Sequence, residues 1–152
     1  MKGKLKKLTA VILSIALLGS AGIFTGLNAF ADAPTTYTEI SLGQTIELEM
    51  DSNSTKVYFK FVPALTDQYR FYSSSARANS RYTDPYGGLM NENGNDLISN
   101  DDGGDGWNFD FSYTLEANKT YYFWAYNRSG NSTETVPVTL THNHIDNDDD
   151  GI

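Results

Sequence analysis

The chain has 152 residues, no cysteine and a formal net charge of −8. Without cysteine it has no disulfide framework, no thiol nucleophile and no site for lipid attachment through a cysteine. The acidic charge argues against nucleic acid and anionic membrane lipid as partners, and it favours cations or basic surfaces.

Residues 1–31 have the pattern of a secretory signal peptide. The basic start contains four lysines, Lys2, Lys4, Lys6 and Lys7. An apolar run follows and ends on Ala29-Phe30-Ala31, the A-x-A arrangement of a cleavage site. The run is nearly long enough to span a membrane, so an uncleaved anchor is the alternative. Cleavage would leave 121 residues with a net charge of −12, because the four lysines leave with the leader. We therefore expect a secreted protein, extracellular or at the cell surface, that has no membrane contact after cleavage.

Alternation of apolar and polar residues, the period of a β-strand, dominates the rest of the chain. In chain order it covers residues 40–42, 46–50, 57–61, 69–72, 84–99, 107–115, 121–127 and 136–140. Within 84–99 the Asn93-Gly94 pair is a hairpin signal. About seven or eight short strands, with turn signals at roughly ten-residue spacing, predict an all-β fold of the antiparallel, jelly-roll-like β-sandwich type.

One β-sandwich domain is expected over residues 32–142, followed by an acidic tail over residues 143–152. The cleanest alternation places five residues on one face of a single strand: Trp107, Phe109, Phe111, Tyr113 and Leu115. The side chains expected to be buried between two sheets are Phe59, Phe61, Phe71, Phe109, Phe111 and Val138.

Four segments carry a family pattern: ISLGQTIELEM, KVYFKFVPALTDQYRFYSSS, NENGNDLISNDDGG and NFDFSYTLEANKTYYFWAYN. In this order, over about residues 38–141, they resemble the bacterial pre-peptidase C-terminal domain. The resemblance implies a jelly-roll-like β-sandwich that serves as an accessory, usually non-catalytic, domain of secreted enzymes and surface proteins. It also implies calcium and collagen as ligands, which some relatives in clostridial collagenases bind.

The segment before the strand at residues 107–115 is rich in oxygen ligands. Its candidate metal ligands are Asn100, Asp101, Asp102 and Asp105. Calcium takes about six to eight oxygens from carboxylates and carbonyls. The intervening glycines let the backbone bend so that carbonyls also converge. Asp, Asn and Gly are equally what a tight β-loop uses, so a turn without metal is the alternative.

A second candidate calcium site lies in the tail. Its residues match the D-x-D-x-D-G opening of a calcium loop, through Asp146, Asp148, Asp150 and Gly151. The sequence supplies no closing acidic ligand, so we expect either weak binding or a solvated acidic run.

The strand YYFWAYN has aromatic residues on both faces. One face carries Tyr122, Trp124 and Tyr126, and both faces of a sandwich strand cannot enter the core. These three side chains are therefore the candidate ligand-binding surface, for stacking on sugars or packing against a protein. Neighbouring loops that cover them are the alternative.

No catalysis is expected. The two histidines, His142 and His144, lie near the C-terminal end, which is a poor place for a Ser-His-Asp triad. We expect a secreted, non-catalytic accessory module that is stabilised by calcium and contacts an extracellular protein or polysaccharide. Two alternatives remain open: a carbohydrate-binding module, and a structural spacer or secretion accessory with no ligand of its own.

Overall fold

The computed structural model describes residues 32–51, 53–75, 83–129 and 133–142. The expected leader and the acidic tail lie outside these ranges, and with the tail the candidate ligands Asp146, Asp148 and Asp150. The described part consists of β-strands and loops, and it contains no helix that could cross a membrane.

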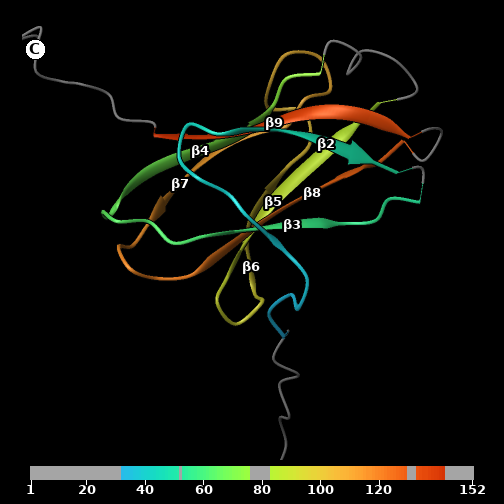
Figure 1. Cartoon of the computed structure of the whole chain (residues 1–152). Coiled ribbons are helices and arrows are strands. Elements are labelled where there is room, and N and C mark those ends of the chain that lie inside the picture. The colour runs from blue at the N-terminus through green and yellow to red at the C-terminus, as the bar shows by residue number, and fades with distance from the viewer. Residues whose placement is uncertain (1–31, 52, 76–82, 130–132, 143–152) are drawn as a thin grey trace, which may run out of the picture.

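Nine strands are present in the described part (Figure 1). They are β1 (Thr38–Glu39), β2 (Thr45–Met50), β3 (Val57–Phe61), β4 (Asp67–Ser73), β5 (Pro85–Asn91), β6 (Asp96–Asn100), β7 (Asp110–Leu115), β8 (Tyr121–Asn127) and β9 (Glu134–His142).

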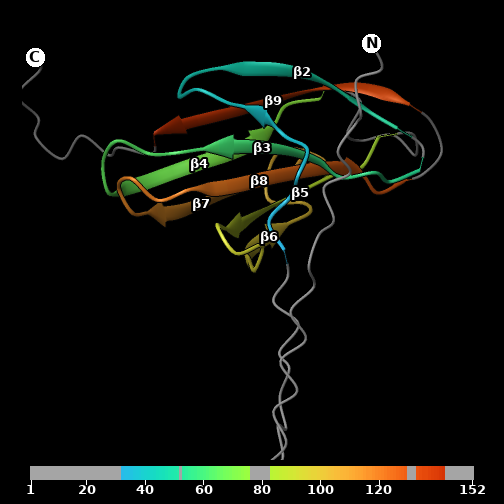
Figure 2. The ribbon, with the colours of Figure 1, turned by 60° about the horizontal axis from the view of Figure 1, so that its bottom comes forward.

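The strands form two facing sheets, as Figures 1 and 2 show from two sides. One sheet has the order β1-β3-β8-β5-β6 and the other the order β2-β9-β4-β7. The pairs are antiparallel except β1 with β3, which is parallel. The predicted all-β sandwich is therefore confirmed, with nine strands rather than seven or eight. The two-residue β1 is too short to produce any alternation.

The core is a cluster of aromatic rings that joins the two sheets. Phe71 of β4 is fully buried and contacts four rings at centroid distances of 4.7–6.1 Å: Phe59, Phe109, Phe111 and Phe123. The shortest of these distances, 4.7 Å, reaches Phe123 in the opposite sheet. Val136, Val138 and Leu140 of β9 are also completely buried, as period-two alternation requires.

One residue of the predicted core and the start of one predicted strand are wrong. Phe61 is only half-buried, because it stands at the end of β3 and packs against Tyr69 at 5.3 Å. Trp107 is 40 % exposed and does not belong to the strand that starts at Asp110. Gly106 has a φ of 67°, which keeps this part of the chain in a turn.

The predicted hairpin at Asn93-Gly94 is present between β5 and β6. Gly94 has a φ of 76°, and backbone bonds link Asn91 to Gly94 and to Asn95 at 3.0 Å each. The hairpin pairs Gly87 with Asn100, after a register shift near Leu89. The start of β5 therefore lies beside the end of β6.

A large-to-small substitution at the centre of the ring cluster tests the core. We expect Phe71→Ala to lower the free energy of unfolding by about 3–5 kcal/mol, because it leaves a cavity among four rings. Leu65, which is 62 % exposed, is the control, and we expect Leu65→Ala to change stability by less than about 0.5 kcal/mol. Equilibrium denaturation measures both, and equal values for the two variants would contradict the assigned core.

Candidate functional site

The loop between β6 and β7 is held by the side chain of Asn100. Its Oδ1 accepts hydrogen bonds from the backbone N–H of Gly103 (2.8 Å) and of Asp110 (3.0 Å). A Cβ on Gly103 would come within 2.4 Å of the Asp110 carbonyl oxygen, so this approach requires glycine. The loop thus leaves one sheet and enters the other with fixed ends.

A buried amide, Asn108, ties the same loop to the end of β4. Its Oδ1 accepts from the Ser73 hydroxyl (2.8 Å) and the Ser75 N–H (2.9 Å). Its Nδ2 donates to the carbonyls of Asp105 (2.8 Å) and Ser75 (3.1 Å). The buried amide therefore makes three hydrogen bonds to backbone and one to a side chain, which together stabilise one loop conformation.

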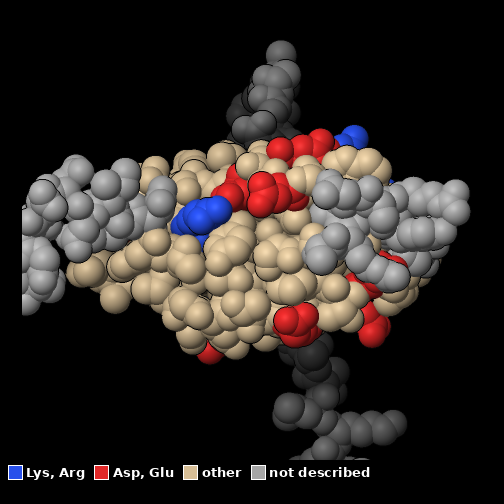
Figure 3. Space-filling model, turned by 90° about the horizontal axis from the view of Figure 1, so that it is seen from above, with Lys and Arg blue, Asp and Glu red and all other residues tan. Residues whose placement is uncertain are grey.

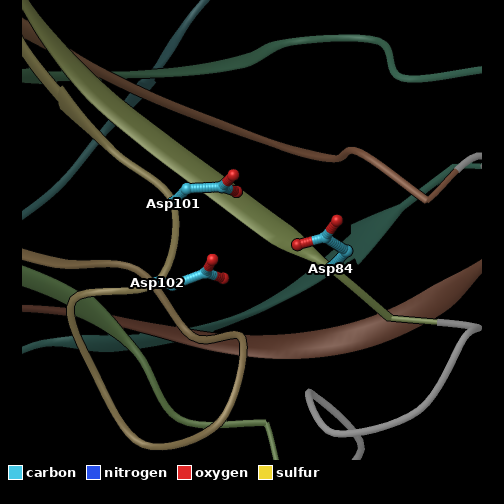
Figure 4. A group of neighbouring side chains, drawn as sticks. All are labelled: Asp84, Asp101 and Asp102. Carbon is cyan, nitrogen blue, oxygen red and sulfur yellow. The ribbon is translucent and has the colours of Figure 1, made fainter.

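The carboxylate of Asp84, the residue just before β5, lies near those of Asp101 and Asp102 in the β6–β7 loop. The Asp84 N–H donates to Oδ1 of Asn127 at 3.0 Å, and its carbonyl accepts from the Arg128 N–H at 2.7 Å. The side chains of Asp101 and Asp102 point toward that of Asp84 (Figure 4). One carboxylate oxygen from each of the three lies within 4.8 Å of the others. We call these three residues the acidic triad.

The acidic triad carries more negative charge than its surroundings balance. Arg128 pairs with Oδ2 of Asp101, whereas Oδ1 of Asp101 is buried and lacks a hydrogen-bond partner among the described residues. Burial, and then the charge of Asp102, raise the pKa of Asp84, while Arg128 lowers it to a smaller degree. Three carboxylates and one guanidinium leave a net charge of −2, which one divalent cation would neutralise.

The geometry of the acidic triad fits calcium. Two oxygens bound to one calcium ion can lie up to about 5 Å apart, because each sits about 2.3–2.6 Å from the ion. Oxygen ligands from carboxylates are those that a hard cation prefers. The buried and unpartnered Asp101 oxygen is the kind of atom that a bound cation would satisfy.

The structure brings together only two of the four loop residues that the sequence predicts as metal ligands. Asp101 and Asp102 belong to the acidic triad. Oδ1 of Asn100 already binds two backbone amides. Asp105 lines a separate polar cavity with Arg70 and Asp110.

The sequence analysis missed Asp84, although a signal was present. The Asn93-Gly94 turn folds the chain back on itself, and the resulting register pairs residue 87 with residue 100. Extending that register places Asp84 beside the residues that follow Asn100. By that register residue 84 falls opposite residue 103, which places Asp84 within two positions of Asp101 and Asp102.

A cavity of about 570 Å³ adjoins the acidic triad. Its walls include the rings of Tyr86 and Tyr126, whose centroids are 5.5 Å apart, together with Asp101, Asp102 and Arg128. The Tyr86 hydroxyl and the Ser99 hydroxyl share a hydrogen bond of 2.8 Å. Burial raises the pKa of Tyr126, and the charges of Tyr86 and Asp84 raise it further. The cavity is thus lined by both aromatic and charged side chains.

The predicted ligand-binding residues Tyr122, Trp124 and Tyr126 share the outer face of the five-stranded sheet. Trp124 is only 1 % exposed and Tyr122 8 %, while Tyr126 is half-buried. The Lys56 ammonium lies 3.7 Å from the centre of the Trp124 ring, and Tyr37 packs on Tyr122 at 5.6 Å. Other side chains therefore cover the faces of the two most buried rings.

The opposite side of the molecule, on which β2 and β9 lie, offers few basic groups. Figure 3 shows separate patches of acidic side chains on this face and little lysine or arginine. Arg70 is paired there with Asp110 through two hydrogen bonds, of 2.8 and 2.5 Å. The guanidinium of Arg70 is therefore already neutralised.

No family model matches the chain. The curated proteins contain no match either. Among solved structures, the chain is similar to the pre-peptidase C-terminal domain of collagenase from Bacillus anthracis, with 14 % identity and a TM-score of 0.56 over 72 % of this chain and 99 % of that one. It is also similar to PliG of Aeromonas hydrophila, a periplasmic inhibitor of g-type lysozyme, with 14 % identity and a TM-score of 0.46 over 69 % of this chain and 92 % of that one. The first likeness confirms that the chain has the fold of a pre-peptidase C-terminal domain, as its sequence pattern indicated.

Proposed function

We propose that this chain is an exported, non-catalytic binding module that calcium stabilises and that contacts an extracellular protein. The observation that carries the proposal is the acidic triad, in which the start of β5 and the loop after β6 bring three carboxylates together. The likeness in fold to a domain of a collagenase supports an accessory role. The signal-like residues 1–31 support export.

The surroundings of His142 show no catalytic arrangement among the described residues. This histidine packs against the ring of Tyr69 at 4.6 Å, and its Nε2 has no hydrogen-bond partner among the described residues. A histidine that acts as a general base must hydrogen-bond the nucleophile that it activates. The described part of the chain places no such nucleophile against Nε2 of His142.

Calcium would act on stability because of where the acidic triad lies. Asp84 immediately precedes β5, and the other two carboxylates open the loop that leads from β6 to the opposite sheet. An ion bound to all three would link the start of one strand to the end of its neighbour. Burial and then the charge of Asp102 raise the pKa of Asp84, and a bound cation would offset both effects by stabilising the charged carboxylate.

A protein partner fits the outer face better than a flat polysaccharide does. Trp124 and Tyr126 stack on each other at 6.0 Å, and Tyr86 meets both rings edge-on. Rings whose faces are occupied by other rings offer no continuous platform for sugars. A short sugar is the second candidate function, and the cavity that Tyr86 shares with two aspartates is the feature that favours it.

Calorimetry of residues 32–152 tests calcium binding at the acidic triad. At a concentration about 100-fold above its Kd, calcium should stabilise the fold by about 2.7 kcal/mol and raise the melting temperature accordingly. We expect the Asp101→Asn, Asp102→Asn double variant to lose this shift. The tail variant with Asp146→Asn, Asp148→Asn and Asp150→Asn is the control and should retain it. A tail variant that loses the shift would place the binding in the tail instead.

The variant Asp84→Asn distinguishes two roles of the Asp84 carboxylate, repulsion within the acidic triad and binding of calcium. In chelator the variant should melt at a higher temperature than the wild type, because the substitution removes a carboxylate whose raised pKa shows that its charged form is disfavoured in the folded state. With calcium the variant should melt at a lower temperature than the wild type, because it has lost a charged ligand. Two parallel melting series at neutral pH measure this, and a variant that is less stable in both would contradict the proposed role.

A panel of immobilised extracellular proteins and a glycan array distinguish the partner classes. We expect saturable binding of residues 32–152 to a matrix protein and no binding to long polysaccharides, because the aromatic faces are covered. Binding to short glycans alone would favour the second candidate function. Binding to neither class, in the presence of calcium, would indicate a spacer without a ligand of its own.

A further inference from the structure

The cavity beside the acidic triad has two kinds of lining residues. Tyr86 and Tyr126 supply aromatic surface, whereas Asp101, Asp102 and Arg128 supply charged groups. Its volume of about 570 Å³ falls within the range of roughly 300–1,000 Å³ that is typical of small-molecule sites. We call it the triad cavity.

A calcium ion at the acidic triad would keep coordination positions for a ligand. Calcium takes about six to eight oxygens. Arg128 already pairs with Oδ2 of Asp101, so this residue offers its buried, unpartnered Oδ1 to an ion. With one oxygen from each of the three carboxylates, about half of the coordination positions remain for oxygens from elsewhere.

The remaining positions are reached from the triad cavity. Asp101 and Asp102 belong to the acidic triad and also line this cavity, and Asp102 is exposed. Two protein oxygens nearby are already in use. Oδ1 of Asn100 accepts from two backbone amides, and the Asp84 carbonyl accepts from the Arg128 N–H. Water or ligand hydroxyls that enter through the triad cavity would therefore complete the coordination.

The charge of the site favours a neutral ligand. Three carboxylates, the Arg128 guanidinium and one divalent cation together have no net charge. An anionic ligand would add negative charge to a chain whose formal net charge is already −8. A cationic ligand would be repelled by both the ion and Arg128. A pair of adjacent hydroxyl groups is neutral, and it can replace two waters on the ion while offering the same kind of oxygen.

The two tyrosines favour a sugar over a simple diol. The rings of Tyr86 and Tyr126 have centroids 5.5 Å apart and an interplanar angle of 86°, so they form a corner. Both residues are only half-buried, which leaves part of each ring to a ligand. The Tyr86 hydroxyl is hydrogen-bonded to that of Ser99 at 2.8 Å, which fixes one ring. A sugar ring combines an apolar C–H face with hydroxyls at its rim, and a corner accommodates one such ring rather than a long chain.

We propose that the triad cavity binds a short neutral sugar through calcium. Two adjacent hydroxyls of the sugar coordinate the ion held by the acidic triad, and the C–H face of the sugar packs in the corner between Tyr86 and Tyr126. This inference rests on the proposed function, because it requires calcium at the acidic triad. It deepens the second candidate function by naming the groups that hold the sugar.

Terbium tests both the ion and the waters bound to it. Terbium occupies calcium sites through the same oxygen ligands, and it luminesces when nearby tyrosine rings are excited. The protein is residues 32–152 with Asp146→Asn, Asp148→Asn and Asp150→Asn, so that the tail carries no candidate ligands. Luminescence lifetimes in H₂O and in D₂O give the number of waters on the ion. The probes are the methyl glycosides of glucose, mannose, galactose and N-acetylglucosamine, each compared with its fully O-methylated form.

We expect at least one glycoside to bind saturably and to displace about two waters from the ion, because two hydroxyls take their place. Its O-methylated form should displace none. In calcium, Tyr86→Leu and Tyr126→Leu should each weaken that glycoside by about three- to tenfold, the effect of losing one aromatic contact. Tyr37→Ala is the control, because this exposed ring lies outside the triad cavity, and it should bind as the wild type does. Melting curves show which variants retain the fold.

An unchanged number of bound waters with all four glycosides at high millimolar concentration would overturn the inference. Equally tight binding in chelator would also overturn it, since the sugar would then need no ion, and so would undiminished binding by both leucine variants. If no terbium luminescence depends on Asp101 and Asp102, calcium at the acidic triad and the sugar site are both wrong. If terbium binds there and no sugar does, only the sugar site is removed, and the proposed function stands.

Discussion

The constraint on which this structure depends is that the central strand of one sheet is apolar on both faces. Phe123 and Ala125 of β8 enter the core, while Trp124 and Tyr122 project to the other side. An antiparallel sheet of a sandwich normally buries one face and leaves the other to water. Here the outer face must also be covered, and the sandwich gains a partial third layer.

That third layer is assembled from side chains and from a short segment rather than from a further sheet. Lys56 lies over the Trp124 ring, Tyr86 packs edge-on against it, and Asp96 accepts a hydrogen bond from its Nε1 at 3.2 Å. Beneath the ring a Cβ on Gly88 would come within 2.2 Å, so the indole lies directly on the backbone of β5. Residues 32–37 lie beside this outer face and line a groove together with Lys56, Tyr58 and Met90.

The sequence was sufficient for the fold and for part of the site. Period-two alternation located the strands because inward residues are apolar wherever a sheet faces a core, as Val136, Val138 and Leu140 show. The alternation gave a wrong strand start at Trp107, because it continues through residues that form a turn. A pattern of side chains does not reveal the positive φ of Gly106 that makes this turn. Asp84 was missed because its position beside the loop after Asn100 depends on the register of the β5–β6 hairpin, and that register shifts near Leu89. The contact between Lys56 and Trp124 could not be predicted either, because nothing in the sequence around Lys56 identifies the ring on which its ammonium lies.

The loop from β6 to β7 shows how this chain closes a long connection without sulfur. Asn100 and Asn108 hold it through hydrogen bonds of their side-chain amides, whereas many small exported domains are stabilised by disulfides. These hydrogen bonds form when the strands pair, and they require neither an oxidant nor thiol exchange. Folding of this loop therefore requires no oxidation step, and a reductant has no bond of this loop to break.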